Sequence, residues 1–284
     1  MGADIKSIKN RIRSIDSTLH VTKAMQLVAS SKIKRAAEAA SGASSYSDAV
    51  CAAMHDIVSP ETAGSVFVAP KESGKTLIVA VAGDRGLAGG YNSNIIKLLS
   101  AEIAETDAAV LPVGRRIYDY CVHHGISLFD NVFRSSEKLT DNGIREISGA
   151  ITEKFAAGEY RAVKVLGTRP VNVLTQTAEI KTVLPLERAG NGSTQTVFEP
   201  DAETVMNSAI PDYLTAVICA EIRKSFLSEL YARRNAMDSA TKNASEMIDR
   251  LNLSYNRARQ SSITQEITEI VAGAENQRES ETSL

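Results

Sequence analysis

The stretch IKSIKNRIRSIDSTL at residues 5–19 places an aliphatic side chain at every third or fourth position. Those side chains belong to Ile5, Ile8, Ile12, Ile15 and Leu19. A three-four spacing is the apolar seam of a heptad repeat, which one helix buries against another. The stretch therefore predicts a helix with a narrow apolar seam that needs a helical partner.

The same helix is expected to continue well beyond residue 19. The sequence holds no glycine or proline between Gly2 and Gly42, so nothing in it ends the helix early. Past Leu19 the heptad frame meets polar residues, and we expect the apolar stripe to slip to Val21, Met25 and Val28.

The C-terminal part of the chain carries a second long seam. Residues 212–272 hold no glycine or proline, and as one helix they would span roughly 90 Å. A helix entry is expected at residues 208–211 and a stop at Gly273. The three-four spacing continues through Met237, Thr241, Ala244, Ile248, Leu251, Tyr255 and Ala258.

Helices of this length cannot be buried within one compact domain, because helices in globular proteins average about 11–12 residues. The two chain ends carry the only long seams, so the sequence predicts that they pair as an antiparallel coiled coil. The alternative is a bundle of shorter helices that break at unmarked positions. Polar or charged residues stand where a self-sufficient coiled coil would place apolar ones, which suggests specific contacts with an enclosing protein: Thr22, Gln26, Arg233, Arg234, Gln260 and Thr264.

The middle of the chain alternates β-rich runs with helical stretches, which indicates a mostly parallel sheet with helices on its faces. Expected strands are 77–82, 109–113, 163–167, 171–177 and 180–184, and expected helices are 92–105, 115–124 and 141–157. The stretch AGNGSTQT at 189–196 predicts a polar linker.

Composition narrows the class of protein. A hydrophobic content of 43% with 23% charged residues is typical of a folded globular chain, and no apolar run approaches the length of a bilayer span. The N-terminus shows no secretory h-region, and the three cysteines cannot build a disulfide framework, so we expect a soluble intracellular protein.

Residues 1–41 hold eight cations against three anions. This basic face is suited to an acidic partner, although a plain solvated face gives the same pattern. Nucleic acid is not an expected partner, because no aromatic residues are interleaved for base stacking.

The segment GDRGLAGGYN at 83–92 follows an expected strand and precedes an expected helix. Glycines at such a turn let the backbone approach a phosphate, which would make the segment a nucleotide site. However, the spacing is not GxGxxG and no phosphate-binding GK[ST] follows, so a tight structural turn is the favoured interpretation.

No other motif indicates catalysis. His123 and His124 are adjacent and lack metal-ligand spacing, His20 and His55 stand alone, and no cysteine lies in a nucleophile motif. The sequence therefore predicts no catalytic residue, no metal and no cofactor.

Several long motifs mark both ends and the middle of the chain. They are IKNRIRSIDSTLHVTKAMQLVASSKIKRA at 8–36, GDRGLAGGYNSNI at 83–95, SELYARRNAMDSATKNASEMIDRL at 228–251, and YNRARQSSITQE with ITEIVAGA at 255–274. Together these motifs resemble the gamma subunit of bacterial-type F-type ATP synthases. The resemblance implies a fold of two parts: a coiled coil from residues 1–58 and 208–274, and a central Rossmann-like α/β domain at 74–200. A polar tail follows at 275–284.

The resemblance also implies a function. In the family this chain is the non-catalytic rotor shaft that couples ion flow through a membrane ring to ATP synthesis or hydrolysis on the beta subunits. The implied partners are the alpha and beta subunits, the epsilon subunit and the c-subunit ring. Membrane association would be indirect, at the cytoplasmic face of the bacterial cell membrane. The alternative function is a nucleotide-binding enzyme that uses the glycine-rich segment 83–92.

By motif, the residues expected to contact beta-subunit loops are Met25, Arg233, Gln260 and Thr264, with Lys23 and Arg259 beside them. Plain core filling is the alternative role for Met25. The sequence departs from the family pattern at Ala88, where a cysteine is usual, at Arg234, and in the polar tail.

Overall fold

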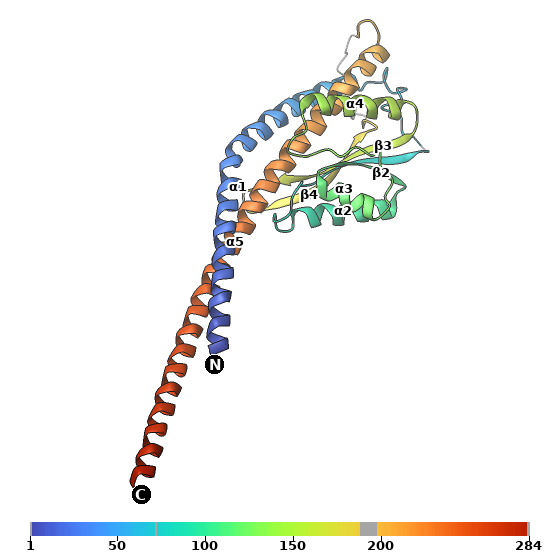
Figure 1. The fold of residues 1–284 in the computed structure, drawn as a ribbon. Coiled ribbons are helices and arrows are strands. Elements are labelled where there is room, and N and C mark those ends of the chain that lie inside the picture. The colour runs from blue at the N-terminus through green and yellow to red at the C-terminus, as the bar shows by residue number, and fades with distance from the viewer. Residues whose placement is uncertain (1, 72, 188–197, 283–284) are drawn as a thin grey trace. The chain divides into compact units, whose positions relative to one another are not determined.

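The computed structural model describes residues 2–71, 73–187 and 198–282. Their elements follow the order α1 (Gly2–Ile57), β1 (Lys75–Val81), α2 (Tyr91–Glu105), β2 (Ala108–Val113), α3 (Arg115–His123), α4 (Asp141–Ala156), β3 (Tyr160–Pro170), β4 (Gln176–Leu184) and α5 (Ala202–Thr282) (Figure 1). Residues 28–236 form one compact unit, the α/β unit. The two chain ends, up to Leu27 and from Met237 onward, form the other, the shaft unit. The expected linker at 189–196 lies outside the described residues.

The α/β unit is built on a four-stranded sheet in the order β2-β1-β3-β4. Strand β1 pairs in parallel with β2 and β3, whereas β4 runs antiparallel to β3 at the edge. The predicted mostly parallel sheet is thus confirmed.

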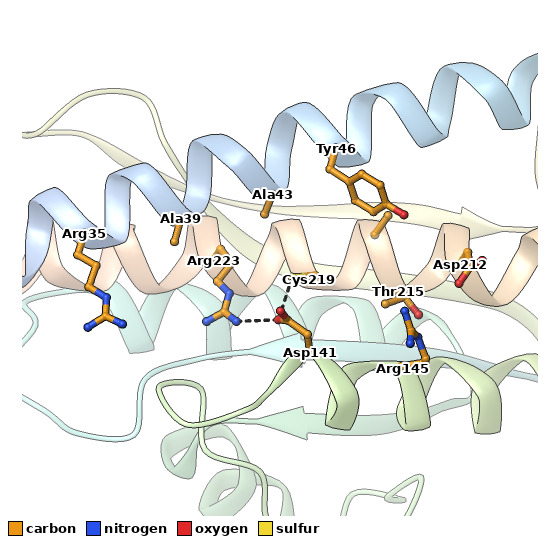
Figure 2. Close-up of a pocket in the computed structure, with 11 residues that line it drawn as sticks. Arg35, Ala39, Ala43, Tyr46, Asp141, Arg145, Asp212, Thr215, Cys219 and Arg223 are labelled. Carbon is orange, nitrogen blue, oxygen red and sulfur yellow. Dashed lines mark hydrogen bonds and ion pairs between the residues drawn. The ribbon is translucent and has the colours of Figure 1, made fainter.

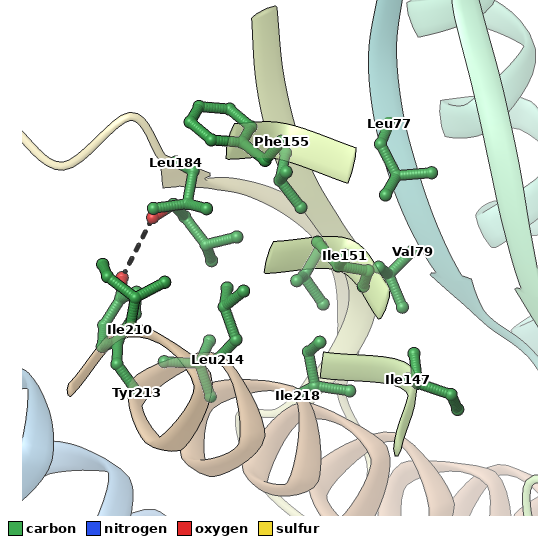
Figure 3. Close-up of a cluster of buried hydrophobic side chains, with 14 of the residues drawn as sticks. Leu77, Val79, Ile147, Ile151, Phe155, Leu184, Ile210, Tyr213, Leu214 and Ile218 are labelled. Atoms are coloured by element: carbon green, nitrogen blue, oxygen red, sulfur yellow. Dashed lines mark hydrogen bonds between the residues drawn. The ribbon is translucent and has the colours of Figure 1, made fainter. Parts of the chain in front are cut away.

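Helices cover both faces of this sheet and form a core on each face. The buried residues of β1 alternate between these two cores. Leu77 and Val79 pack with α4 and with the start of α5 in one core, which Figure 3 shows around Ile151 and Leu214. Ile78 and Ala80 pack on the opposite face against α2 and α3. The apolar run 77–82, which shows no alternation in sequence, is therefore a strand buried on both sides.

The expected strand at 171–177 was wrong over residues 171–175, which form the turn of the β3–β4 hairpin. The Asn172 side-chain oxygen accepts hydrogen bonds from the backbone N–H groups of Leu174 and Thr175, both at 2.8 Å. This local bond closes a turn that competes with the extended conformation expected from Val171 and Val173.

Both expected limits of the C-terminal helix were also wrong. α5 begins at Ala202, because the Asp201 carboxylate accepts the N–H of Thr204 at 2.8 Å and caps the helix. Pro211 lies inside the helix, and α5 continues through Gly273 to Thr282. An interior glycine costs a helix only about 1 kcal/mol, which does not force it to end.

The two chain ends pair in the shaft unit as the sequence predicted. Across the pair, the Thr241 hydroxyl donates to the Thr22 hydroxyl at 2.9 Å and the Gln26 amide donates to Asp238 at 3.0 Å. As the residue number rises on α1 it falls on α5, so the helices are antiparallel. In the α/β unit the same two helices pack Ala36 against Leu227 and Leu230.

The predicted seams are confirmed on both helices. Each aliphatic position of the 5–19 stretch is half-buried between exposed neighbours, and each seam position from Met237 to Ala258 is buried or half-buried. The expected slip of the stripe was wrong, because Val21 and Val28 are 55% and 57% exposed while Thr22 is buried. The heptad frame continues through Thr22, whose hydroxyl is satisfied across the pair.

Replacing Ile151 with alanine tests the core of the α/β unit. Ile151 is fully buried, so Ile151→Ala should lower the free energy of unfolding by about 2–5 kcal/mol in chemical denaturation. Leu174→Ala is the control, since Leu174 is 79% exposed, and its effect should stay within about 0.5 kcal/mol. Equal losses for the two variants would contradict this core.

A proline in the seam tests the paired helix. Ala244 is buried in the shaft unit, and Ala244→Pro should cost about 3 kcal/mol or more. Hydrogen exchange should show lost protection around residues 237–258 and unchanged protection in strands β1 and β3. Ala244→Gly, which costs about 1 kcal/mol, is the milder control. Full protection of 237–258 in the proline variant would show that the segment is not one continuous helix.

Candidate functional site

The glycine-rich turn lies between β1 and α2, at the carboxyl end of the parallel strands. The Asn92 side chain closes it, because its oxygen accepts the Gly83 N–H at 2.9 Å and its nitrogen donates to the Arg85 carbonyl at 3.2 Å. Leu87 and Gly89 adopt the left-handed conformation, with φ of 61° and 55°. A backbone N–H at the start of the turn is thus already bonded within the protein.

Asp84 holds the position that an anion would need at the neighbouring helix. Its carboxylate accepts the backbone N–H of Arg115, the first residue of α3, at 3.1 Å. It also accepts the Ser135 hydroxyl at 2.5 Å and the Ser136 N–H at 3.3 Å. The helix N-terminus, which favours negative charge, is therefore occupied by the chain's own carboxylate.

A second carboxylate closes the turn from the side of α5. Glu229 is 4% exposed, and a Cβ added to Gly83 would lie 2.8 Å from its carboxyl group. The Arg233 guanidinium bonds Glu229 at 2.5 Å and the Gly86 carbonyl at 3.4 Å. Gly83 is thus required for the close approach of a side chain.

Burial shifts the pKa values of two acidic groups at this turn. Burial raises the pKa of Glu229, while Arg233 favours the charged form and limits the rise. Burial together with nearby Glu229 also holds the pKa of the Tyr91 phenol well above its usual range. The Arg233 guanidinium that bonds the Gly86 carbonyl is already paired with Glu229. The Arg116 guanidinium also lies close to Gly86, 2.8 Å from where a Cβ would stand.

A groove of about 630 Å³ lies elsewhere in the α/β unit, between α1, α4 and α5 (Figure 2). Arg223 is bonded to Asp141 at 2.9 Å, and burial raises the pKa of the Cys219 thiol that faces the same carboxylate. A thiol with a raised pKa stays protonated and is a poor nucleophile. The groove is lined by Arg35, Ala39, Ala43, Tyr46, Asp141, Arg145, Asp212, Thr215, Ala216, Cys219 and Arg223. It is a charged surface without a nucleophile–base pair among these lining residues.

The residues singled out from the sequence fall in both units. In the shaft unit, Lys23, Arg259, Gln260 and Thr264 are exposed and Met25 is half-buried. Arg233 lies in the α/β unit, where Glu229 holds it and leaves its side chain 13% exposed. The structure therefore brings Arg233 to the glycine-rich turn, in a different unit from the other five residues.

Sequence reasoning missed Asp84, Asn92 and Glu229 as the residues that fill the turn. One local signal was present, because Glu229 precedes Arg233 by four residues, a spacing at which helical side chains meet. Nothing local indicates that this pair faces Gly83, since that contact joins segments about 150 residues apart. The described residues hold no cluster of three metal-ligating side chains, and none of their helices has the length and apolar character needed to cross a bilayer.

Comparison with known proteins gives consistent matches over most of the chain. A family model described as ATP synthase matches residues 4–276. The ATP synthase gamma chain of Ruminococcus albus is 39% identical, with 96% of this chain and 99% of that relative covered. The sodium-ion-specific ATP synthase gamma chain of Acetobacterium woodii is 36% identical, over 97% and 99% of the two chains.

Solved structures share the fold at low sequence identity. A chain of the Euglena gracilis mitochondrial ATP synthase (OSCP/F1/c-ring) gives a TM-score of 0.66 at 16% identity, over 96% of this chain and 94% of that one. A chain of the Tetrahymena thermophila mitochondrial ATP synthase central stalk and c-ring gives 0.62 at 19% identity, covering 78% and 99%. With its paired terminal helices, its α/β sheet and a glycine-rich turn filled by its own side chains, the protein belongs to the ATP synthase gamma-chain family.

Proposed function

We propose that this chain is the central rotor shaft of an F-type ATP synthase, which couples ion flow through a membrane ring to ATP synthesis or hydrolysis on the beta subunits. The chain itself carries no catalysis. A shaft with an asymmetric surface touches each surrounding beta subunit differently, and such differential contact is what holds chemically identical subunits in different affinity states. Turning the shaft passes these states from one subunit to the next.

The observation that carries this proposal is that the C-terminal end of α5 in the shaft unit extends beyond its pairing with α1. The antiparallel register places Gly2 opposite about residue 261, so α5 continues alone from there. Ile263, Ile267 and Ile270 on this end are 43%, 56% and 72% exposed. Exposed aliphatic side chains on one element mark an interaction surface, which fits insertion into an enclosing ring of subunits.

The residues proposed to contact beta-subunit loops are Met25, Arg233, Gln260 and Thr264, with Lys23 and Arg259 as neighbours. Gln260 and Thr264 flank the position on α5 that lies opposite the first residue of α1, and their side chains are exposed. Arg233 differs from the others, because Glu229 holds its guanidinium. Its contact would use the part of the side chain that remains exposed.

The proposed partners are the alpha and beta subunits around the shaft, with the epsilon subunit and the c-subunit ring at the other end. Through that ring the chain would lie at the cytoplasmic face of a bacterial cell membrane as a peripheral subunit. The proposed functional division assigns the coiled coil to residues 1–58 and 208–274, the foot to 74–200 and a tail to 275–284.

The competing function, a nucleotide-binding enzyme at the turn 83–92, predicts binding that the rotor shaft does not. Because Asn92 and Asp84 already bond the backbone N–H groups of Gly83 and Arg115, titration calorimetry of the isolated chain with ATP, ADP or NAD should show no saturable binding at micromolar concentrations. Micromolar binding that Gly86→Val abolishes would contradict the shaft proposal.

Gln260→Ala tests the proposed beta contact. Losing one interfacial hydrogen bond worth about 1 kcal/mol should lower ATP turnover or coupling of the assembled complex by about fivefold. Asn256→Ala is the matched control, since Asn256 is an exposed amide one turn earlier on α5. Circular dichroism should be unchanged for both variants. Wild-type turnover and coupling in Gln260→Ala would remove this residue from the proposed contact.

A further inference from the structure

Helix α5 changes the character of the face that it turns to the sheet. Over residues 210–218 that face is apolar, with Ile210, Leu214 and Ile218 in the core of Figure 3. From residue 221 onward it becomes polar while staying buried. We call this second part the polar seam, and it consists of Glu221, Ser225, Ser228, Glu229 and Arg233.

Two serines of the polar seam replace a missing strand. Strand β1 pairs with β3 only as far as Leu166, two residues before Thr168. Beyond that point the Thr168 N–H donates to the Ser225 hydroxyl and the Ser228 hydroxyl donates to the Thr168 carbonyl, both at 2.9 Å. Both serines are fully buried. The helix thereby satisfies the two backbone groups that β1 would have paired.

Two glycines in the α/β unit make room for the side chains of the polar seam. A Cβ on Gly167 would lie 2.8 Å from the Ser225 hydroxyl and 3.3 Å from the Glu221 carboxylate. A Cβ on Gly83 would lie 2.8 Å from Glu229, which in turn holds Arg233 against the Gly86 carbonyl. The polar seam thus lies against the backbone at two points, Gly83 just after β1 and Gly167 in β3.

Such a contact fixes position in a way that apolar packing does not. Apolar contact is non-directional, so it specifies the register of a helix less sharply than hydrogen bonds do. A shift of α5 by one turn, about 5.4 Å, would carry Ser225 and Ser228 away from Thr168 and leave its two backbone groups buried without partners. It would also separate Glu229 from the space at Gly83.

We propose that the polar seam fixes the axial and rotational register of α5 on the sheet of the α/β unit, so that torque applied to that sheet passes into α5. This inference rests on the proposed rotor function. Torque that enters at the α/β unit must pass into α5, and the seam lies in the last turns before α5 enters the shaft unit at Met237. Ser225, Ser228 and Glu229 are positioning residues in this account.

The register of α5 on the α/β unit can be measured without ATP turnover by the complex. Spin labels are attached through a ketone-bearing unnatural amino acid at Val122 on α3 and at Arg234 on α5, both exposed, so that the native cysteines stay. In the assembled complex the wild-type distance distribution should be a single narrow peak. The double variant Ser225→Ala/Ser228→Ala and the variant Glu229→Gln should each broaden it at least twofold or add a second peak. Ser208→Ala, an exposed serine of the same helix, should leave it unchanged.

The mechanical consequence is read in single-molecule rotation of the same complexes, with the probe on the α/β unit. The angular variance of the probe during pauses should rise at least twofold in both seam variants, and Ser208→Ala should match the wild type. If the distance distributions of both seam variants superimpose on the wild type, the register role is overturned. A broadened spin-label distance distribution with an unchanged angular variance of the probe would overturn the role of the polar seam in passing torque to α5. A wild-type probe that never rotates would instead contradict the proposed rotor function, whatever the distances show.

Discussion

The pairing of α1 with α5 is the constraint on which the rest of the structure depends. Each helix carries a seam too narrow to be stable alone, and each buries that seam against the other, with Thr22 bonded to Thr241 and Gln26 to Asp238. Because the two helices are the chain ends, the α/β unit is inserted between them in the sequence. The same pairing leaves the C-terminal end of α5 without α1, and so exposes the aliphatic side chains of that end.

The α/β unit shows how a fold associated with nucleotides can serve a different purpose. Its glycine-rich turn has the position of a phosphate site, yet Asn92, Asp84 and Glu229 use the groups that a phosphate would need. Gly83 and Gly167 serve close contact with α5. The features that resemble a ligand site are therefore features of attachment between a sheet and a long helix.

Much of this architecture was predictable because periodicity reports directly on burial. The seam positions of both terminal helices and the four strands of the sheet follow from sequence spacing. Errors arose where the hydrogen bonds of a polar side chain overrode the apolar pattern. Thr22 continues the seam because it bonds to the distant Thr241, whereas Asn172 closes a turn by local bonds inside a run of β-forming residues. The role of Glu229 could not be predicted, since it depends on the tertiary contact with Gly83.

The most direct test of the rotor account is to watch the α/β unit turn. With the catalytic hexamer fixed to a surface and a probe attached at Val122, ATP hydrolysis should drive continuous rotation in one direction. A reversible crosslink between the shaft unit and one beta subunit should stop both rotation and turnover, and cleavage of that crosslink should restore both. Sustained ATP turnover with a stationary probe, or full turnover in the crosslinked complex, would contradict the account.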